Sequence, residues 1–184
     1  MSSTMSVCPG CRLVLPSPDG AMDTQYNASW ACRQLSGEVA AYTLALGDAD
    51  FIHQLGVDAY CAQHAGPTVK PIGIAFALIG LLLMFERGYT GRQVQKAHMQ
   101  LGNRSKVWPR FEPPDEKARL NGTVQPVRAR FEVASRLTVM DVAQSPAGNE
   151  RNAMLKRWGR SVWDFWTPEH DKVRALVDKT LYAS

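Results

Sequence analysis

The sequence lacks the features of a secreted or membrane-embedded protein. Its first residues, MSSTMSVCPGC, contain no basic stretch followed by an apolar one, so we expect no secretory signal. The longest apolar stretch, residues 72–85, is shorter than the ~20 residues that span a bilayer, and it predicts a buried helix instead. We therefore expect a cytoplasmic protein that makes no membrane contact.

Common catalytic signatures are also absent. The chain contains no P-loop, no dinucleotide-binding fingerprint and no nucleophile motif. It shows no internal repeat and no low-complexity tract. These patterns do not require an enzyme, and they leave open whether the protein is one.

Composition indicates a single globular domain over residues 1–184, because 45% of the residues are hydrophobic and 21% are charged. The charge is uneven: residues 1–90 carry four Lys/Arg against seven Asp/Glu, whereas residues 91–184 carry seventeen against ten. A basic half is one feature of nucleic-acid-binding proteins. Mixed charges are more typical of a solvated surface, so nucleic-acid binding is an alternative that we do not favour.

Helical spacing of apolar residues, with capping signals between the segments, predicts a mostly α, compact helical bundle. The segment from Phe76 to Phe85 should be its most buried element. Weak alternation within residues 123–131 is compatible with a short β-hairpin. The expected parts are an irregular cysteine-bearing N-terminus (1–26), a four-helix core (27–102, with helices near 27–46, 48–66, 71–87 and 90–102), an irregular segment (103–136) and C-terminal helices (137–184, near 138–142, 149–166 and 167–182).

The four cysteines are the strongest chemical signal. In a chain without a secretory signal they are more typical of thiols or metal ligands than of disulfides. Cys8-Pro-Gly-Cys11 has the form of a zinc knuckle, in which a tight turn joins two thiolates. Cys32 supplies a third sulfur, and tetrahedral zinc requires one more ligand.

His53, Cys61 and His64 are the candidates for this fourth ligand. If the first two helices are antiparallel and joined near residues 47–48, the numbers of facing positions add up to about 96, which places Cys32 opposite position 64. His53 and His64 lie about 16 Å apart on one helix and cannot share an ion. We therefore predict a structural zinc site of Cys8, Cys11, Cys32 and His64, with Cys61 as the second choice. In the alternative, Cys32 and Cys61 are buried apolar thiols.

A second polar group, formed by His53, Asp58 and His98, is a weaker candidate for acid–base or metal chemistry in a small enzyme. Satisfied core or surface polar groups account for the same residues more simply. The leading hypothesis is thus a zinc-stabilised helical binding or regulatory protein; the sequence does not identify its partner, and a protein is one possible class. Several C-terminal aromatic residues fall at core-packing spacing, and Trp163 lies beside that stripe, so we expect it to be exposed.

Four motifs together resemble an uncharacterised bacterial family, a domain of unknown function. They are CPGC at residues 8–11, YNAS-x2-C at 26–32, HQ-x2-VDAY-x2-QH at 53–64 and TGRQV at 90–94. The resemblance covers most of the chain and implies no established activity or substrate. One departure is Arg12, where the resemblance leads us to expect glycine, the residue that suits a turned backbone.

Overall fold

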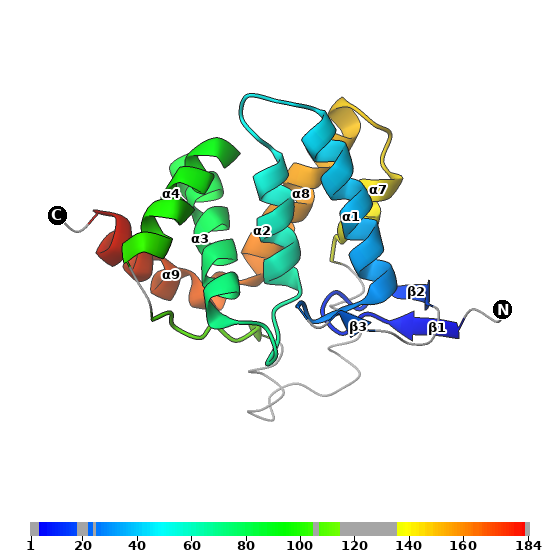
Figure 1. Cartoon of the computed structure of the whole chain (residues 1–184), viewed down its shortest axis with the longest axis horizontal. Helices are drawn as coiled ribbons and strands as arrows, with labels where there is room; N and C mark the ends of the chain where they lie inside the picture. Colours follow the sequence, from blue (N-terminus) through cyan, green and yellow to red (C-terminus); the bar gives the residue numbers. More distant parts are fainter. Residues whose placement is uncertain (1–3, 18–21, 24, 105–106, 115–135, 183–184) are drawn as a thin grey trace.

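The computed structural model describes residues 4–17, 22–23, 25–104, 107–114 and 136–182, and most of these residues lie in helices (Figure 1). The mostly α fold expected from the sequence is therefore confirmed. The helices are α1 (Trp30–Ala45), α2 (His53–Gln63), α3 (Pro71–Arg87), α4 (Gly91–Arg104), α7 (Val139–Gln144), α8 (Asn149–Phe165) and α9 (His170–Val177), with short helical turns at Thr167–Glu169 and Asp178–Tyr182.

Capping groups set the bounds of several helices. The Ser29 side chain accepts a hydrogen bond from the backbone N–H of Cys32 and starts α1. Helix α3 begins with Pro71 and ends at Gly88, whose φ of 68° lies in the left-handed region. A reciprocal capping box between Thr138 and Asp141 starts α7. These four ends agree with the sequence-based expectations.

Helix α2 begins later than expected. The sequence predicted a helix from about residue 48, but α2 starts at His53, after a connection over residues 46–52. The Asp48 carboxylate does accept the backbone N–H of Ile52, at 3.2 Å, but Phe51 has a φ of 57°. This left-handed residue interrupts the helix at the point where the chain turns.

The N-terminal segment contains two short antiparallel sheets, which the expectation of an irregular segment did not include. Strands β1 (Thr4–Val7) and β2 (Val14–Ser17) pair with Val7 opposite Val14, so residues 8–13 form the loop between them. Strand β3 (Met22–Asp23) pairs with β4 (Ala28–Ser29), immediately before α1. The hairpin considered for residues 123–131 lies outside the described residues.

The last helix also differs at its start. Thr167-Pro168-Glu169 forms a 3-10 turn, and α9 begins at His170. The Trp166 N–H donates to the Trp163 carbonyl at 2.9 Å, and the Glu169 N–H donates to the Trp166 carbonyl at 2.8 Å. This tighter turn bends the chain so that α9 returns toward α3, which it contacts.

Helix α2 lies at the centre of the bundle, between α1 and α3, and it also packs on α8 (Figure 1). Every residue from Ala77 to Leu83 of α3 is buried, in agreement with the expected position of the core. None of the helices within the described ranges has the combination of length and apolarity needed to cross a bilayer.

Asp58 lies in the tightest contact between α2 and α3. A Cβ atom placed on Gly80 would overlap the Asp58 carboxyl group. Gln54 donates a hydrogen bond to Asp58 Oδ1 at 3.0 Å, whereas Oδ2 is buried with no hydrogen-bond partner in the described part of the chain. Burial raises the pKa of Asp58 well above its usual value, which favours the neutral acid.

We expect Asp58→Asn to change how stability depends on pH. The folded state binds the Asp58 proton more tightly than the unfolded chain, whose aspartates titrate near a pKa of about 3.9. Asp58 therefore favours folding most at low pH, and its contribution falls by about 1.4 kcal/mol for each pH unit between the two pKa values. Urea unfolding of wild type and variant between pH 5 and 8 measures the difference between their free energies of unfolding. The contributions of all other titrating groups cancel in this difference. A pH-independent difference, like that expected for exposed Asp50→Asn, would show that Asp58 is ionised.

Two glycine substitutions test the packing of the bundle. Gly80→Ala forces a methyl group against the Asp58 carboxyl, and we expect it to lower the free energy of unfolding by about 1–3 kcal/mol. Gly37, inside α1, has nothing within 4 Å of the position that a methyl group would occupy, so Gly37→Ala should raise stability by about 0.5–1 kcal/mol through helix propensity. Thermal and urea unfolding compare the two variants. Equal effects would contradict the close approach at Gly80.

Candidate metal centre

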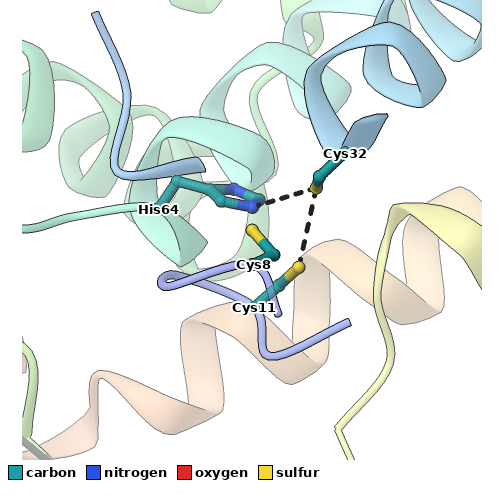
Figure 2. A group of neighbouring side chains, drawn as sticks. All are labelled: Cys8, Cys11, Cys32 and His64. Carbon is teal, nitrogen blue, oxygen red and sulfur yellow. Dashed lines mark hydrogen bonds between the residues drawn. The ribbon is translucent and has the colours of Figure 1, made fainter. Parts of the chain in front are cut away.

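Three separate segments bring Cys8, Cys11, Cys32 and His64 together (Figure 2). Cys8 and Cys11 lie in the loop between β1 and β2, Cys32 lies in the first turn of α1, and His64 directly follows α2. All four residues are buried, and their ligand atoms all lie within 4.8 Å of one another. The four residues grouped from the sequence are thus neighbours in space, in an arrangement that is able to hold a metal ion.

Two separations between the ligand atoms are close to those of a tetrahedral site. The Sγ atoms of Cys11 and Cys32 are 3.6 Å apart, and Cys32 Sγ is 3.3 Å from His64 Nε2. Ligands bound at about 2.3 Å for sulfur and about 2.0–2.1 Å for nitrogen are separated by roughly 3.5–3.8 Å in a tetrahedron. The cluster therefore needs only small adjustments to surround one ion.

The His64 ring is oriented by the helix that precedes it. Its Nδ1 lies 2.8 Å from the Tyr60 carbonyl oxygen, and a carbonyl oxygen can only accept, so Nδ1 carries the proton. The lone pair of Nε2 then faces Cys32. Tyr60 also stacks on the imidazole, with ring centres 4.0 Å apart. A histidine that donates its other ring N–H to a carbonyl is the usual arrangement behind a metal ligand.

The cysteine loop is tightly turned. The Arg12 N–H donates to the Cys8 carbonyl at 2.9 Å, and the Cys8 N–H donates to the Leu13 carbonyl at 2.7 Å. Arg12 has a φ of 66°, in the left-handed region where glycine is favoured, which explains why the family resemblance places glycine there. A Cβ atom on Gly10 would lie 2.6 Å from both the Asn27 carbonyl oxygen and the His64 ring, so only glycine fits.

Asn27 connects the start of α1 to the end of α2. Its backbone N–H donates to the His64 carbonyl at 3.2 Å, and its side-chain amide donates to the Ala65 carbonyl at 3.3 Å. A Cβ atom on Gly66 would lie 2.7 Å from the Asn27 side chain, so this contact also depends on a glycine. The sequence offers either Asn27 or Ser29 as the cap of the first helix; Ser29 is the cap, and Asn27 makes this contact instead.

The antiparallel register predicted from the sequence holds at both ends of the helix pair. Cys32 meets His64 at one end, and Thr43 Oγ1 lies 2.8 Å from His53 Nδ1 at the other. Both pairs have the predicted sum of residue numbers, even though the connection between the helices is longer than expected. The extra residues form a turn outside the pair and leave the register unchanged.

The thiols of the cluster influence one another's ionisation. Hydrogen bonds from the Cys11 and Cys32 thiols lower the pKa of Cys8, and the contacts with Cys32 and Cys8 raise the pKa of Cys11. Three buried thiolates would repel one another strongly, and a bound cation is what offsets such repulsion. The donor set therefore suits a divalent metal that prefers sulfur and nitrogen.

Cys61, the second choice for the fourth ligand, lies elsewhere. Its thiol donates to the Gly73 carbonyl of α3 at 3.4 Å, and burial raises its pKa to about 12. It is a packing thiol between α2 and α3, as the alternative interpretation of this residue stated.

His53, Asp58 and His98 do not form a shared pocket. His53 contacts Thr43 of α1, Asp58 faces Gly80, and the His98 ring N–H donates to the Phe76 carbonyl of α3 at 3.0 Å. Helices α1 and α3 lie on opposite sides of α2 (Figure 1). Burial lowers the pKa of His98 to about 4, so this histidine is neutral and engaged in packing. The geometry does not support the acid–base pocket considered from the sequence.

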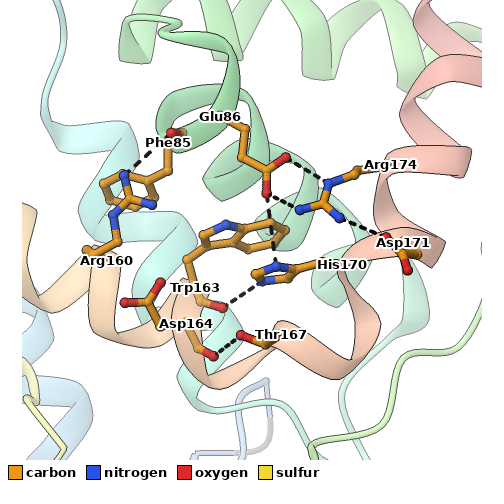
Figure 3. Close-up of polar contacts among 9 residues, drawn as sticks. All are labelled: Phe85, Glu86, Arg160, Trp163, Asp164, Thr167, His170, Asp171 and Arg174. Carbon is orange, nitrogen blue, oxygen red and sulfur yellow. Dashed lines mark hydrogen bonds and ion pairs between the residues drawn. The ribbon is translucent and has the colours of Figure 1, made fainter.

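Trp163 is buried, so the expectation that it is exposed is wrong. Only 1% of the residue is accessible, and its indole stacks on His170 with ring centres 3.7 Å apart. The His170 ring donates to the Trp163 carbonyl at 2.9 Å, and Arg174 binds Glu86 beside it at 2.8 and 2.9 Å (Figure 3). The turn before α9 places His170 over the indole, a tertiary contact that helical periodicity does not reveal.

Comparison with known proteins agrees with the resemblance found in the sequence. Residues 6–167 match the model of a family of unknown function (DUF5946). No curated protein and no solved structure matches the chain. The matched region contains all four residues of the cluster and most of the helices, and the protein belongs to this family of unknown function.

Proposed function

We propose that Cys8, Cys11, Cys32 and His64 bind one zinc ion, and that this ion stabilises a helical binding or regulatory protein. The observation that carries the proposal is the group of four buried residues whose ligand atoms lie within 4.8 Å of one another, with the Nε2 lone pair of His64 directed at the group. Zinc is favoured because tetrahedral sites of thiolate and imidazole ligands are typical of this metal.

The proposed role of the ion is structural. Three thiolates and one imidazole fill all four positions of a tetrahedron, whereas catalytic zinc keeps one position for water or substrate. All four ligands are buried, and His64 and Cys32 are fully inaccessible to solvent. A substrate would have no route to the metal without displacing a ligand.

The ion would attach the N-terminal ribbon to the bundle. A single two-stranded hairpin is at best marginally stable in water. Met5, Val7 and Val14 of this ribbon are between 54% and 62% exposed, so they contribute little to a core. Leu13 and Leu15 pack against the core, and the metal would add to this packing in ordering residues 4–17. The same exposed apolar side chains suit contact with a protein partner, the class of partner that we favour.

We expect purified protein to contain about one zinc per chain. Cys11→Ser and His64→Ala each remove a ligand and should lower the zinc content at least tenfold, as measured by elemental analysis of dialysed protein. Cys61→Ser and His53→Ala are the controls, because both side chains lie outside the cluster, and they should keep the metal. Full zinc occupancy in His64→Ala, or wild-type protein without metal, would contradict the assignment.

Removal of zinc should loosen the N-terminal ribbon before the core. If the ion contributes at least about 3 kcal/mol, chelation lowers the Tm by at least about 6–12 °C, and added zinc restores it. Hydrogen exchange followed by mass spectrometry should show faster exchange in residues 4–17, while Ala77–Leu83 of α3 stays protected. If the ribbon stayed as protected without metal as with it, the structural role would be refuted.

A further inference from the structure

A cavity of about 260 Å³ lies between α1 and α2, beside the candidate metal centre. Tyr60 belongs to both sites: it lines the cavity, and its hydroxyl points at Cys32 Sγ from 3.9 Å. None of the described residues that line the cavity is acidic. The polar side chains that line it are those of Tyr26, Arg33, Ser36, Thr43, His53 and Tyr60.

Ser36 places a hydroxyl group on the wall of the cavity, although only 8% of the residue is exposed. A serine hydroxyl both donates and accepts hydrogen bonds. A ligand in the cavity can therefore accept a hydrogen bond from Ser36.

His53 offers a hydrogen-bond acceptor at one end of the cavity. Thr43 Oγ1 lies 3.0 Å from the carbonyl oxygens of Val39 and Ala40, so its single proton is donated to the backbone. It can then only accept from His53 Nδ1, at 2.8 Å. The proton therefore sits on Nδ1 and leaves Nε2 with a free lone pair. Burial lowers the pKa of His53, which favours this neutral form.

Arg33 provides the positive charge at the other end. Its guanidinium carbon lies 5.1 Å from the centre of the Tyr26 ring and 5.9 Å from that of Tyr60, so two aromatic rings hold it in place. A guanidinium carries five N–H donors in a planar fork that matches a carboxylate. Arg33 and Thr43 are about 15 Å apart along α1, which makes the cavity elongated.

A larger pocket, of about 690 Å³, is a weaker candidate for binding an anion because two aspartates, Asp48 and Asp50, line it. Asp48 accepts the backbone N–H of Ile52, Thr90 caps α4, and Asn152 accepts a hydrogen bond from Tyr42. Among the described residues that line the smaller cavity, in contrast, the charged side chain is the cationic Arg33.

We propose that the cavity between α1 and α2 binds a small carboxylate with an apolar body and a hydroxyl group at its far end. The carboxylate lies against Arg33 and accepts from Ser36, the body packs between Val39, Val139 and Trp158, and the hydroxyl donates to His53 Nε2. The volume, just below the ~300 Å³ at which drug-sized sites begin, suits a metabolite-sized molecule. This proposal rests on the proposed function as a binding module. Ligand binding depends on zinc only because the ion holds α1 against α2.

Binding of 4-hydroxybenzoate to the zinc-loaded full chain, followed by ligand-detected NMR and calorimetry, tests the proposal. We expect saturable binding that weakens at least tenfold for benzoate, which lacks the hydroxyl, and for 4-hydroxybenzamide, which lacks the charge. Arg33→Gln and Ser36→Leu should each weaken binding at least tenfold, the second by filling the cavity. Arg92→Gln is the matched control, because that guanidinium also lies 5.1 Å from an aromatic ring, that of Phe51, but outside the cavity.

Zinc content measured in the same samples separates this proposal from that of the metal site. Zinc-loaded protein that does not bind 4-hydroxybenzoate, or that binds all three compounds equally, overturns the ligand assignment and leaves the metal site intact. Unchanged binding in both Arg33→Gln and Ser36→Leu, with zinc retained, also overturns it. Selective binding of 4-hydroxybenzoate by purified protein that carries no zinc would support the ligand site in the cavity and refute the proposed zinc site.

Discussion

The antiparallel register of α1 against α2 is the constraint on which both sites depend. It sets Cys32 against His64 and Thr43 against His53, and the cavity lies between these two contacts. The register follows from the buried positions of α1, which recur every three or four residues at Cys32, Ser36, Val39 and Thr43. A shift of one residue would separate the ligands and leave the Thr43 hydroxyl without its histidine.

The buried face of α1 carries several polar side chains, and these side chains have different roles. The Thr43 hydroxyl fixes the tautomer of His53, and the Tyr60 carbonyl fixes that of His64. Each histidine is thereby left with an unprotonated Nε2. The Nε2 of His64 faces the cysteine cluster, whereas His53 lines the cavity. Two histidines on one helix thus obtain different environments from the residues around them.

The sequence predicted much of the fold because local signals agreed with the final packing. The apolar run and the terminal proline and glycine located α3, and the helix pairing located His64 beside Cys32. The predicted start of α2 was wrong because Phe51 adopts a left-handed backbone conformation, which is rare for phenylalanine. The predicted exposure of Trp163 was wrong because a later segment of the chain, which follows the turn before α9, covers the indole. The cavity could not be predicted from the spacing of apolar residues. The one hint in the sequence was a polar residue, Ser36, on the buried face of α1.

The coordination of the metal is the property that most directly tests this account. Zinc K-edge X-ray absorption of the purified full chain should show three sulfur neighbours at about 2.3 Å and one nitrogen at about 2.0–2.1 Å. That first shell requires that residues 8–11, α1 and the end of α2 meet at one ion. A shell dominated by oxygen and nitrogen, or one with fewer than three sulfur atoms, would contradict it.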